Sequence, residues 1–215
     1  MPVRKIKKNY RNVTGVSAAT KAVGDAEFES TLERDFLRLL EFSSDVARFE
    51  VQPVTITWFG ESGEERSYTP DVWVAFRDGT GRQPWLCEVK YRSELKKLWP
   101  KFRPKFRQAI RYARQHGWRF RLITEVEIRG EELAAAKFLL PFRHRAIPAE
   151  KSERILTLVD ALKETSVGDL LQRIASDPLV QAEWLPVVWH LVAKFEIEAD
   201  LLSPLSMSSK LWSKR

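Results

Sequence analysis

Residues 68–90 read YTPDVWVAFRDGTGRQPWLCEVK, two apolar runs separated by a turn-forming segment. Side chains alternate between the two faces of a strand, so Glu88 and Lys90 point the same way. Asp71 opens the preceding run, and antiparallel pairing across the turn at 78–81 brings it to the same sheet end as Glu88. Two carboxylates and a lysine at one point predict metal-assisted phosphodiester hydrolysis. The acids would hold Mg²⁺, and the lysine would steady the attacking water or the developing charge.

The composition is that of a globular protein. The chain has 215 residues, of which 44% are hydrophobic and 11% aromatic, enough for one sizeable core with or without a small satellite. It has no run of eighteen apolar residues, and its N-terminus lacks an apolar signal core, so we expect a cytoplasmic protein with no membrane association. The single cysteine, Cys87, rules out an internal disulfide and a cysteine-rich zinc site. With no histidine near it in sequence, Cys87 reads as a buried small residue rather than a nucleophile.

Positive charge is concentrated in one part of the chain. The formal net charge is +7, yet the window 92–121 alone holds eleven Lys or Arg and one acid. Residues 148–215 hold eight basic and ten acidic residues. This difference indicates a polyanion-binding unit joined to a module with another task, whose negative charge leaves either a protein or DNA as its partner.

The pattern of apolar residues predicts an α/β fold with a mixed sheet flanked by helices. Helical spacing covers 27–42, strands are expected within 46–59, 67–76, 86–90 and 119–125, and helices within 93–117 and 130–140. Pro100 and Pro104 should divide the 93–117 stretch into a short helix, a kink and a longer helix from about Pro104, and Pro141 should end the helix in 130–140. These elements define a first domain over residues 26–147.

Residues 1–25 form a basic N-terminal segment, which we interpret either as an arm that lies on DNA or a partner, or as a solvated terminus. After Pro148 the pattern predicts three helices, with Ser166 capping the second and Asp177-Pro178 opening the third. An alternating tail at 195–205 looks like a short hairpin, so residues 148–215 are expected to form a small winged-helix domain. Candidate DNA contacts are the basic residues of the arm and of the 93–117 helix, namely Lys21, Lys97, Lys101, Arg103, Lys105, Arg107 and Arg111.

Four motifs in order resemble the N-terminal nuclease domain of the TnsA endonucleases, restriction-enzyme-like subunits of heteromeric DNA transposases. They are STLERDF at 30–36, FEVQP at 49–53, YTPD at 68–71 and EVK at 88–90. Ile128-Arg129, VGDLL at 167–171 and DLL at 200–202 are similar to that family's small winged-helix domain. The resemblance covers roughly residues 20–205, and the chain is short like the compact forms found in CRISPR-associated transposons.

The resemblance implies roles that the residues alone do not. Glu33, by itself a solvated helix acid, would be the third metal-binding acid beside Asp71 and Glu88, with the Val89 carbonyl as a further ligand. Lys90 would handle the water, and one or two Mg²⁺ ions would bind, with Mn²⁺ as a substitute.

The resemblance also implies partners. TnsA-type subunits cut the non-transferred strand at the 5′ ends of a transposon in bacteria, on the nucleoid. A DDE transposase of the TnsB type cuts and joins the other strand, and an AAA+ regulator of the TnsC type contacts the C-terminal part. Two alternatives stay open: a stand-alone restriction or repair nuclease with the same restriction-endonuclease-like core, and a non-catalytic DNA- or partner-binding module whose acids are solvated strand ends.

Overall fold

The structure is a computed structural model that describes residues 14–214. It divides into two compact units, one up to Arg129 and one from Gly130 onward. None of the helices in the described residues combines the length and the apolar character that spanning a bilayer requires. The predicted basic arm lies outside the described residues up to position 13.

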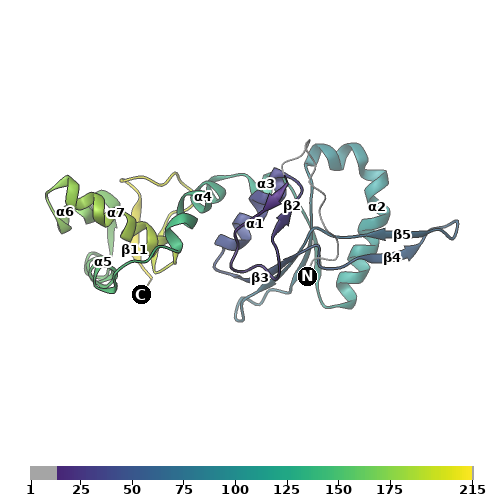
Figure 1. Ribbon diagram of the computed structural model, residues 1–215, viewed down its shortest axis with the longest axis horizontal. Coiled ribbons are helices and arrows are strands. Elements are labelled where there is room, and N and C mark those ends of the chain that lie inside the picture. The colour runs from purple at the N-terminus through teal and green to yellow at the C-terminus, as the bar shows by residue number, and fades with distance from the viewer. Residues whose placement is uncertain (1–13, 215) are drawn as a thin grey trace. The chain divides into compact units, whose positions relative to one another are not determined.

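The first unit is built on a mixed four-stranded sheet (Figure 1). Its strand order is β3-β6-β7-β8, with β7 and β8 parallel and the other neighbours antiparallel. The sheet strands are β3 (Val46–Val51), β6 (Val72–Phe76), β7 (Trp85–Val89) and β8 (Arg119–Ile123). The remaining elements are β1 (Gly15–Val16), β2 (Glu27–Phe28), α1 (Thr31–Phe42), β4 (Ile56–Phe59), β5 (Glu65–Tyr68), α2 (Arg92–Gln115) and α3 (Glu125–Ile128). The predicted α/β class with a mixed sheet flanked by helices is confirmed.

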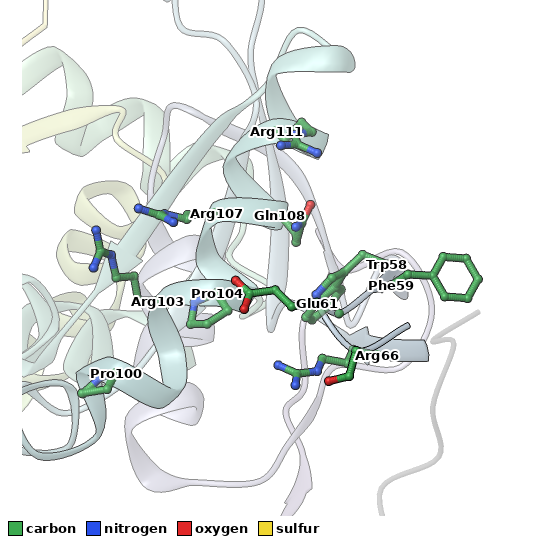
Figure 2. Close-up of a pocket in the computed structure, with 12 residues that line it drawn as sticks. Trp58, Phe59, Glu61, Arg66, Pro100, Arg103, Pro104, Arg107, Gln108 and Arg111 are labelled. Atoms are coloured by element: carbon green, nitrogen blue, oxygen red, sulfur yellow. The ribbon is translucent and has the colours of Figure 1, made fainter. Parts of the chain in front are cut away.

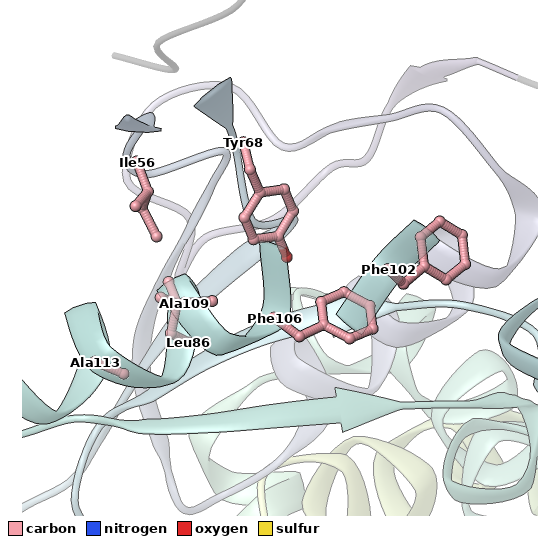
Figure 3. Close-up of a cluster of buried hydrophobic side chains, with 7 residues drawn as sticks. All are labelled: Ile56, Tyr68, Leu86, Phe102, Phe106, Ala109 and Ala113. Atoms are coloured by element: carbon pink, nitrogen blue, oxygen red, sulfur yellow. The ribbon is translucent and has the colours of Figure 1, made fainter. Parts of the chain in front are cut away.

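Helix α2 connects the parallel strands β7 and β8 and packs on them and on the β4–β5 hairpin. Its apolar face carries Phe102, Phe106, Ala109 and Ala113, all buried. Figure 3 shows these side chains clustered with Leu86 of β7 and with Tyr68 and Ile56 of the hairpin. Removing a buried aromatic such as Phe106 from this cluster would destabilise the fold by about 3–5 kcal/mol.

Helix α1 packs on β3 and β7. It begins at Ser30, whose hydroxyl accepts a hydrogen bond from the Glu33 amide at 3.1 Å, a standard helix N-cap. The helical pattern was expected from residue 27, but Glu27 and Phe28 form β2 and pair with β1. The described part of the predicted arm is held against the sheet, because Ala22 bridges Phe49 of β3.

The predicted kink in α2 is present, but its position differs from the expectation, and the predicted helix end at Pro141 is wrong. In α2 the non-helical residue is Leu98, with φ −113° and ψ 16°, rather than Pro100 or Pro104. A proline ring clashes with the preceding turn and disfavours helical backbone just before it, so the break falls ahead of Pro100. Pro104 lies inside the helix that follows, and α4 likewise continues past Pro141.

The second unit consists of four helices and a small three-stranded sheet. Helix α7 is its centre, because α4, α5 and α6 all pack against it. The sheet order is β10-β11-β9, antiparallel throughout. The elements are α4 (Glu131–Arg143), α5 (Ala149–Leu162), β9 (Glu164–Ser166), α6 (Val167–Ile174), α7 (Pro178–Ala193), β10 (Ile197–Ala199) and β11 (Lys210–Ser213).

The caps predicted for this unit are present, since the side chains of Ser166 and Asp177 accept hydrogen bonds from Asp169 and Leu179 amides. The tail hairpin differs from the expectation. The strand that pairs with β10 is β11, at 210–213 instead of 201–205. Helix α4, which the sequence analysis assigned to the first domain, belongs to the second unit.

Candidate active site

Asp71 and Glu88 meet at one end of the sheet, as the strand pattern predicts. Val72 of β6 is directly opposite Cys87 of β7, and the Asp71 amide donates to the Cys87 carbonyl at 3.0 Å. Because side chains alternate, Glu88 shares the α2-facing side of β7 with Leu86, whereas Cys87 and Val89 face the other way. Local pairing therefore places both carboxylates on the same side of the sheet, under α2.

The ammonium of Lys90 lies among three oxygen atoms. Its Nζ is 3.4 Å from Asp71 Oδ2, 3.4 Å from Glu88 Oε1 and 2.9 Å from the Val89 carbonyl oxygen. Three oxygens from three different groups thus surround one cationic atom. We call Asp71, Glu88, Lys90 and the groups that contact them the acidic centre.

Asp71 is fixed by backbone, because the Val89 amide donates to its Oδ2 at 2.6 Å. Burial, followed by the nearby charge of Glu88, raises the pKa of Asp71 well above its usual range. Burial lowers the pKa of Lys90, but Asp71 and Glu88 outweigh it and leave that pKa above its ordinary value. Lys90 therefore stays protonated at neutral pH and acts as a cation and donor rather than as a base.

Two further residues hold Glu88, whose side chain is 1% exposed. Tyr68 donates its hydroxyl to Glu88 Oε2 at 2.5 Å, and Lys105 of α2 contacts Oε1 at 2.8 Å. The Lys105 ammonium also lies over three aromatic rings, 4.4 Å from the centroid of Tyr68, 4.8 Å from Phe102 and 5.2 Å from Phe106. Burial and the neighbouring Glu88 raise the pKa of Tyr68, so it stays a neutral donor.

Tyr68 was not predicted to contact the site, and Lys105 was predicted only as a DNA contact. The pattern YTPD places the tyrosine three residues before Asp71, which gave no reason to expect its hydroxyl at Glu88. Lys105 lies 17 positions after Glu88, and only the packing of α2 on the sheet brings it there. One sequence feature could have indicated that Lys105 faces inward. It lies between Phe102 and Phe106, which belong to the apolar face of the helix.

Glu33 lies at the N-terminus of α1 with both carboxylate oxygens engaged. Oε2 accepts from the Glu29 amide at 2.7 Å, and Oε1 accepts from the Ser30 hydroxyl at 3.0 Å. This is the reciprocal arrangement of a helix cap, in which a glutamate reaches back to free backbone amides. Burial raises the pKa of Glu33, while the Glu29 amide and the charge of Lys90 oppose that change.

A small cavity joins Glu33 to the acidic centre. Its volume is about 10 Å³, and its polar lining comes from Glu27, Glu33, Gln52 and Asp71. That volume is close to what a single water-sized occupant needs. Gln52 is 8% exposed, and its Oε1 has no hydrogen-bond partner among the described residues. Its backbone has φ +49°, the left-handed region that is unusual for a residue with a Cβ.

These residues fit a hard divalent cation. Asp71, Glu88 and the Val89 carbonyl already surround one cation, Lys90 Nζ, and the Gln52 amide oxygen lies unpaired at the neighbouring cavity. Mg²⁺ prefers oxygen ligands and keeps several waters, so it needs only one or two carboxylates from a protein. Within residues 14–214 no group of three or more His, Cys, Asp or Glu side chains is placed to hold an ion by itself. Glu33 borders the acidic centre through the cavity, and its role as the third metal-binding acid stays a prediction.

The other predicted DNA contacts are spread over two surfaces. Lys97, Lys101, Arg103, Arg107 and Arg111 are exposed on α2, while Lys105 is turned toward Glu88. The Lys21 amine donates to the Ser43 carbonyl, and its backbone amide donates to Glu41 at 3.0 Å. Lys21 thus anchors the N-terminal segment to the first unit.

We compared this site with known families. It consists of a Pro-Asp strand, an adjacent Glu-x-Lys strand and a helix that covers them. Residues 43–125 match the family model of the TnsA-like endonuclease N-terminal domain. The resemblance stated from the motifs is confirmed over this segment. The match indicates a transposon-associated nuclease, a hydrolase whose substrate is DNA. A search of the curated proteins found no match to the chain.

The TnsA-like segment includes Asp71, Glu88, Lys90 and the whole of α2. It also includes Gln52, Tyr68 and Lys105, the residues that surround the two carboxylates. Glu33 lies before it, so the match does not extend to the predicted third acid.

Proposed function

We propose that this chain is a Mg²⁺-dependent DNA endonuclease that cuts the non-transferred strand at the 5′ ends of a transposon. It would act with a DDE transposase of the TnsB type and an AAA+ regulator of the TnsC type. The observation that carries the proposal is the convergence of Asp71, Glu88 and the Val89 carbonyl on the Lys90 ammonium, inside the TnsA-like segment.

Asp71, Glu88 and the Val89 carbonyl would hold the ion, with Gln52 and Glu33 on the side of the small cavity. When bound, a divalent cation polarises the phosphate and activates a water for attack, and Mn²⁺ can substitute for Mg²⁺. The ligand set is compatible with one ion, or with two if Glu33 and Gln52 contribute to a second. Lys90 would leave its position between the carboxylates and orient the attacking water or offset charge on the phosphate.

The surrounding residues keep the ligands in place. The Val89 amide fixes one oxygen of Asp71, and Tyr68 and Lys105 fix both oxygens of Glu88. Ligand carboxylates held by such partners need little rearrangement when an ion binds. Lys105 also brings a second positive charge to the position where the phosphate would approach.

The fold of the second unit supports a winged-helix role for residues 148–215. Helices α5, α6 and α7 pack together and are joined to a three-stranded antiparallel sheet, an arrangement compatible with three helices and a wing. Residues 148–215 have two more acidic than basic residues, which favours a protein partner such as the AAA+ regulator over DNA.

The deciding experiment is Asp71→Ala in a strand-specific cleavage assay on a labelled transposon-end duplex, with the matching DDE transposase present. We expect 5′-strand cleavage to fall at least a hundredfold, because a ligand of the ion is lost. Asp78→Ala, in the exposed turn between β6 and β7, is the control and should cut normally. Unchanged cleavage by the Asp71 variant would refute the proposal, and cleavage by the chain without its partner would favour a stand-alone restriction or repair nuclease.

A further inference from the structure

A second polar feature of the first unit is a groove between the β4–β5 hairpin and α2, shown in Figure 2. Its volume is about 640 Å³, within the range of ligand-binding clefts. One wall is α2 from Pro100 to Arg111, and the other is the hairpin from Trp58 to Arg66. We call it the arginine groove, because its lining includes four arginines, namely Arg66, Arg103, Arg107 and Arg111.

The helix wall is a row of positive charge. Arg103, Arg107 and Arg111 are four residues apart and therefore lie on one face of α2, about 6 Å from one to the next along the axis. No ion pair between these three arginines and another residue occurs in the described part of the chain. Arg66 pairs with Glu64 on the hairpin, and Glu61 is the acidic residue of the lining. With Arg66 paired to Glu64, three arginines of α2 face Glu61, and this excess of positive charge favours a polyanion.

The hairpin wall adds aromatic surface. Phe59 is 75% exposed, and Trp58 beside it is partly buried against the α2 cluster. In Figure 2 the Phe59 ring projects outward from the hairpin, away from Arg103 and Arg107 of α2, at the outer edge of the groove. An exposed phenylalanine at a groove lined by arginines is the combination that single-stranded nucleic acids use, with the backbone on the cations and a base on the ring. A fully paired duplex keeps its base faces stacked inside and would leave the ring without a partner.

The groove adjoins the acidic centre through shared elements. Lys105, which contacts Glu88, lies on α2 between Arg103 and Arg107 of the groove wall. Tyr68, which donates to Glu88, ends the hairpin that forms the opposite wall. The groove and the acidic centre thus share α2 and the β4–β5 hairpin, with Lys105 and the groove arginines on different faces of the helix.

We propose that the arginine groove binds unpaired DNA next to the cut, with phosphates on Arg103, Arg107 and Arg111 and one base stacked on Phe59. This deepens the proposed endonuclease function and rests on it. It implies that the DNA end is locally opened when the strand is cut.

The test is fluorescence anisotropy of the full chain with a labelled single-stranded 12-mer and with the same sequence as a duplex, in EDTA so that no cleavage occurs. Phe59→Ala should weaken single-strand binding by about 5- to 100-fold and change duplex binding far less. Leu179→Ala removes a side chain that is 79% exposed in the second unit. As the control, it should change neither single-strand binding nor duplex binding.

Two charge variants test the helix wall. Arg107→Gln should weaken single-strand binding and lower the slope of log affinity against log salt by about 1. Arg114→Gln, on the same helix but outside the groove lining, should bind the single strand with an affinity close to that of the parent. Glu61→Gln should strengthen binding, because it removes the acid that repels phosphate. Single-strand binding by Phe59→Ala equal to the parent, or an equal loss for duplex and single strand, would overturn the inference.

The outcome separates this inference from the proposed function. If Asp71→Ala loses cleavage while Phe59→Ala keeps full single-strand binding, the endonuclease stands and the groove assignment is wrong. If Phe59→Ala loses single-strand binding selectively, the assignment is supported whatever the cleavage assay gives. Because Phe59 is mostly exposed, its truncation should leave the melting temperature unchanged, which confirms that a binding loss is local.

Discussion

The acidic centre and the arginine groove share helix α2 but differ in whether their charged side chains are compensated within the protein. In the centre each carboxylate of Asp71 and Glu88 lies within 3.4 Å of a lysine amine, and Glu88 is fully buried. In the groove Arg103, Arg107 and Arg111 are exposed and have no ion pair among the described residues, and Glu61 is the acid of the lining. A buried charge must be compensated inside the protein, whereas an exposed one can be left for a partner. The difference supports the proposed roles, a preorganised metal site at the acidic centre and a groove whose free positive charge attracts a polyanion.

Among the residues that border Asp71 and Glu88, the largest effect is expected at Glu33. If its carboxylate serves the ion as well as the helix cap, Glu33→Gln should lower cleavage by at least tenfold. The amide oxygen can still accept from the Glu29 amide and the NH2 group can donate to the Ser30 hydroxyl, so the helix cap should survive. The measurement pairs cleavage rate with the rise in melting temperature on adding Mn²⁺; an ion at a hundred times its dissociation constant stabilises the parent by about 2.7 kcal/mol.

Glu33→Ala is the companion variant, because it also removes the side-chain acceptor of the Glu29 amide and should cost a further ~1 kcal/mol of folding stability, while the Ser30 cap bond to the residue 33 amide remains. Parent-like cleavage and a parent-like Mn²⁺ shift in Glu33→Gln would confine Glu33 to the cap. The acidic centre would then consist of two carboxylates.

Lys105 tests whether the centre and the groove are separate, since it lies between groove residues in sequence but contacts Glu88. Lys105→Met should lower cleavage by about tenfold through loss of one charge near the phosphate. It should also increase Mn²⁺ affinity, because Glu88 loses a competing cation. Lys101→Met removes the same charge from an exposed position of the helix and should change neither quantity by that much. A fall in DNA affinity alone, with normal Mn²⁺ affinity, would place Lys105 in the groove.

The smallest effect is a pH dependence that the centre should show and the groove should not. The folded pKa of Asp71 is raised, so without metal its stabilising contribution is fully present below the unfolded pKa and is lost as pH rises through the folded value. Asp71→Asn should therefore gain stability relative to the parent as pH rises above the ordinary aspartate range. Melting temperatures in EDTA across that range measure the gain, and Mn²⁺ should diminish it by binding the parent. A stability difference between Asp71→Asn and the parent that does not change with pH would contradict the raised pKa of Asp71.

Part of the site could be predicted from the sequence because it depends on pairing between strands that are close in the chain. Asp71, Glu88 and Lys90 are on two strands joined by one turn, so alternation and antiparallel pairing were sufficient to bring them together. The caps at Ser166 and Asp177 were likewise set by neighbouring residues. Helix breaks were predicted less well, because the effect of a proline depends on where the helix starts. Leu98 is the non-helical residue in α2, and α4 tolerates Pro141.

By itself the sequence determined the α/β class, the antiparallel pair that carries the two acids, and the basic character of α2, since each follows from local periodicity or composition. Only the tertiary structure decided which of the basic residues face inward. It placed Lys105 over Tyr68, Phe102 and Phe106, left Arg103 and Arg107 in the groove, and brought the unpaired oxygen of Gln52 beside Asp71 and Glu33. The physical reason is that these contacts join segments far apart in the chain. Their partners are selected by how a helix packs on a sheet, and no local pattern records that choice.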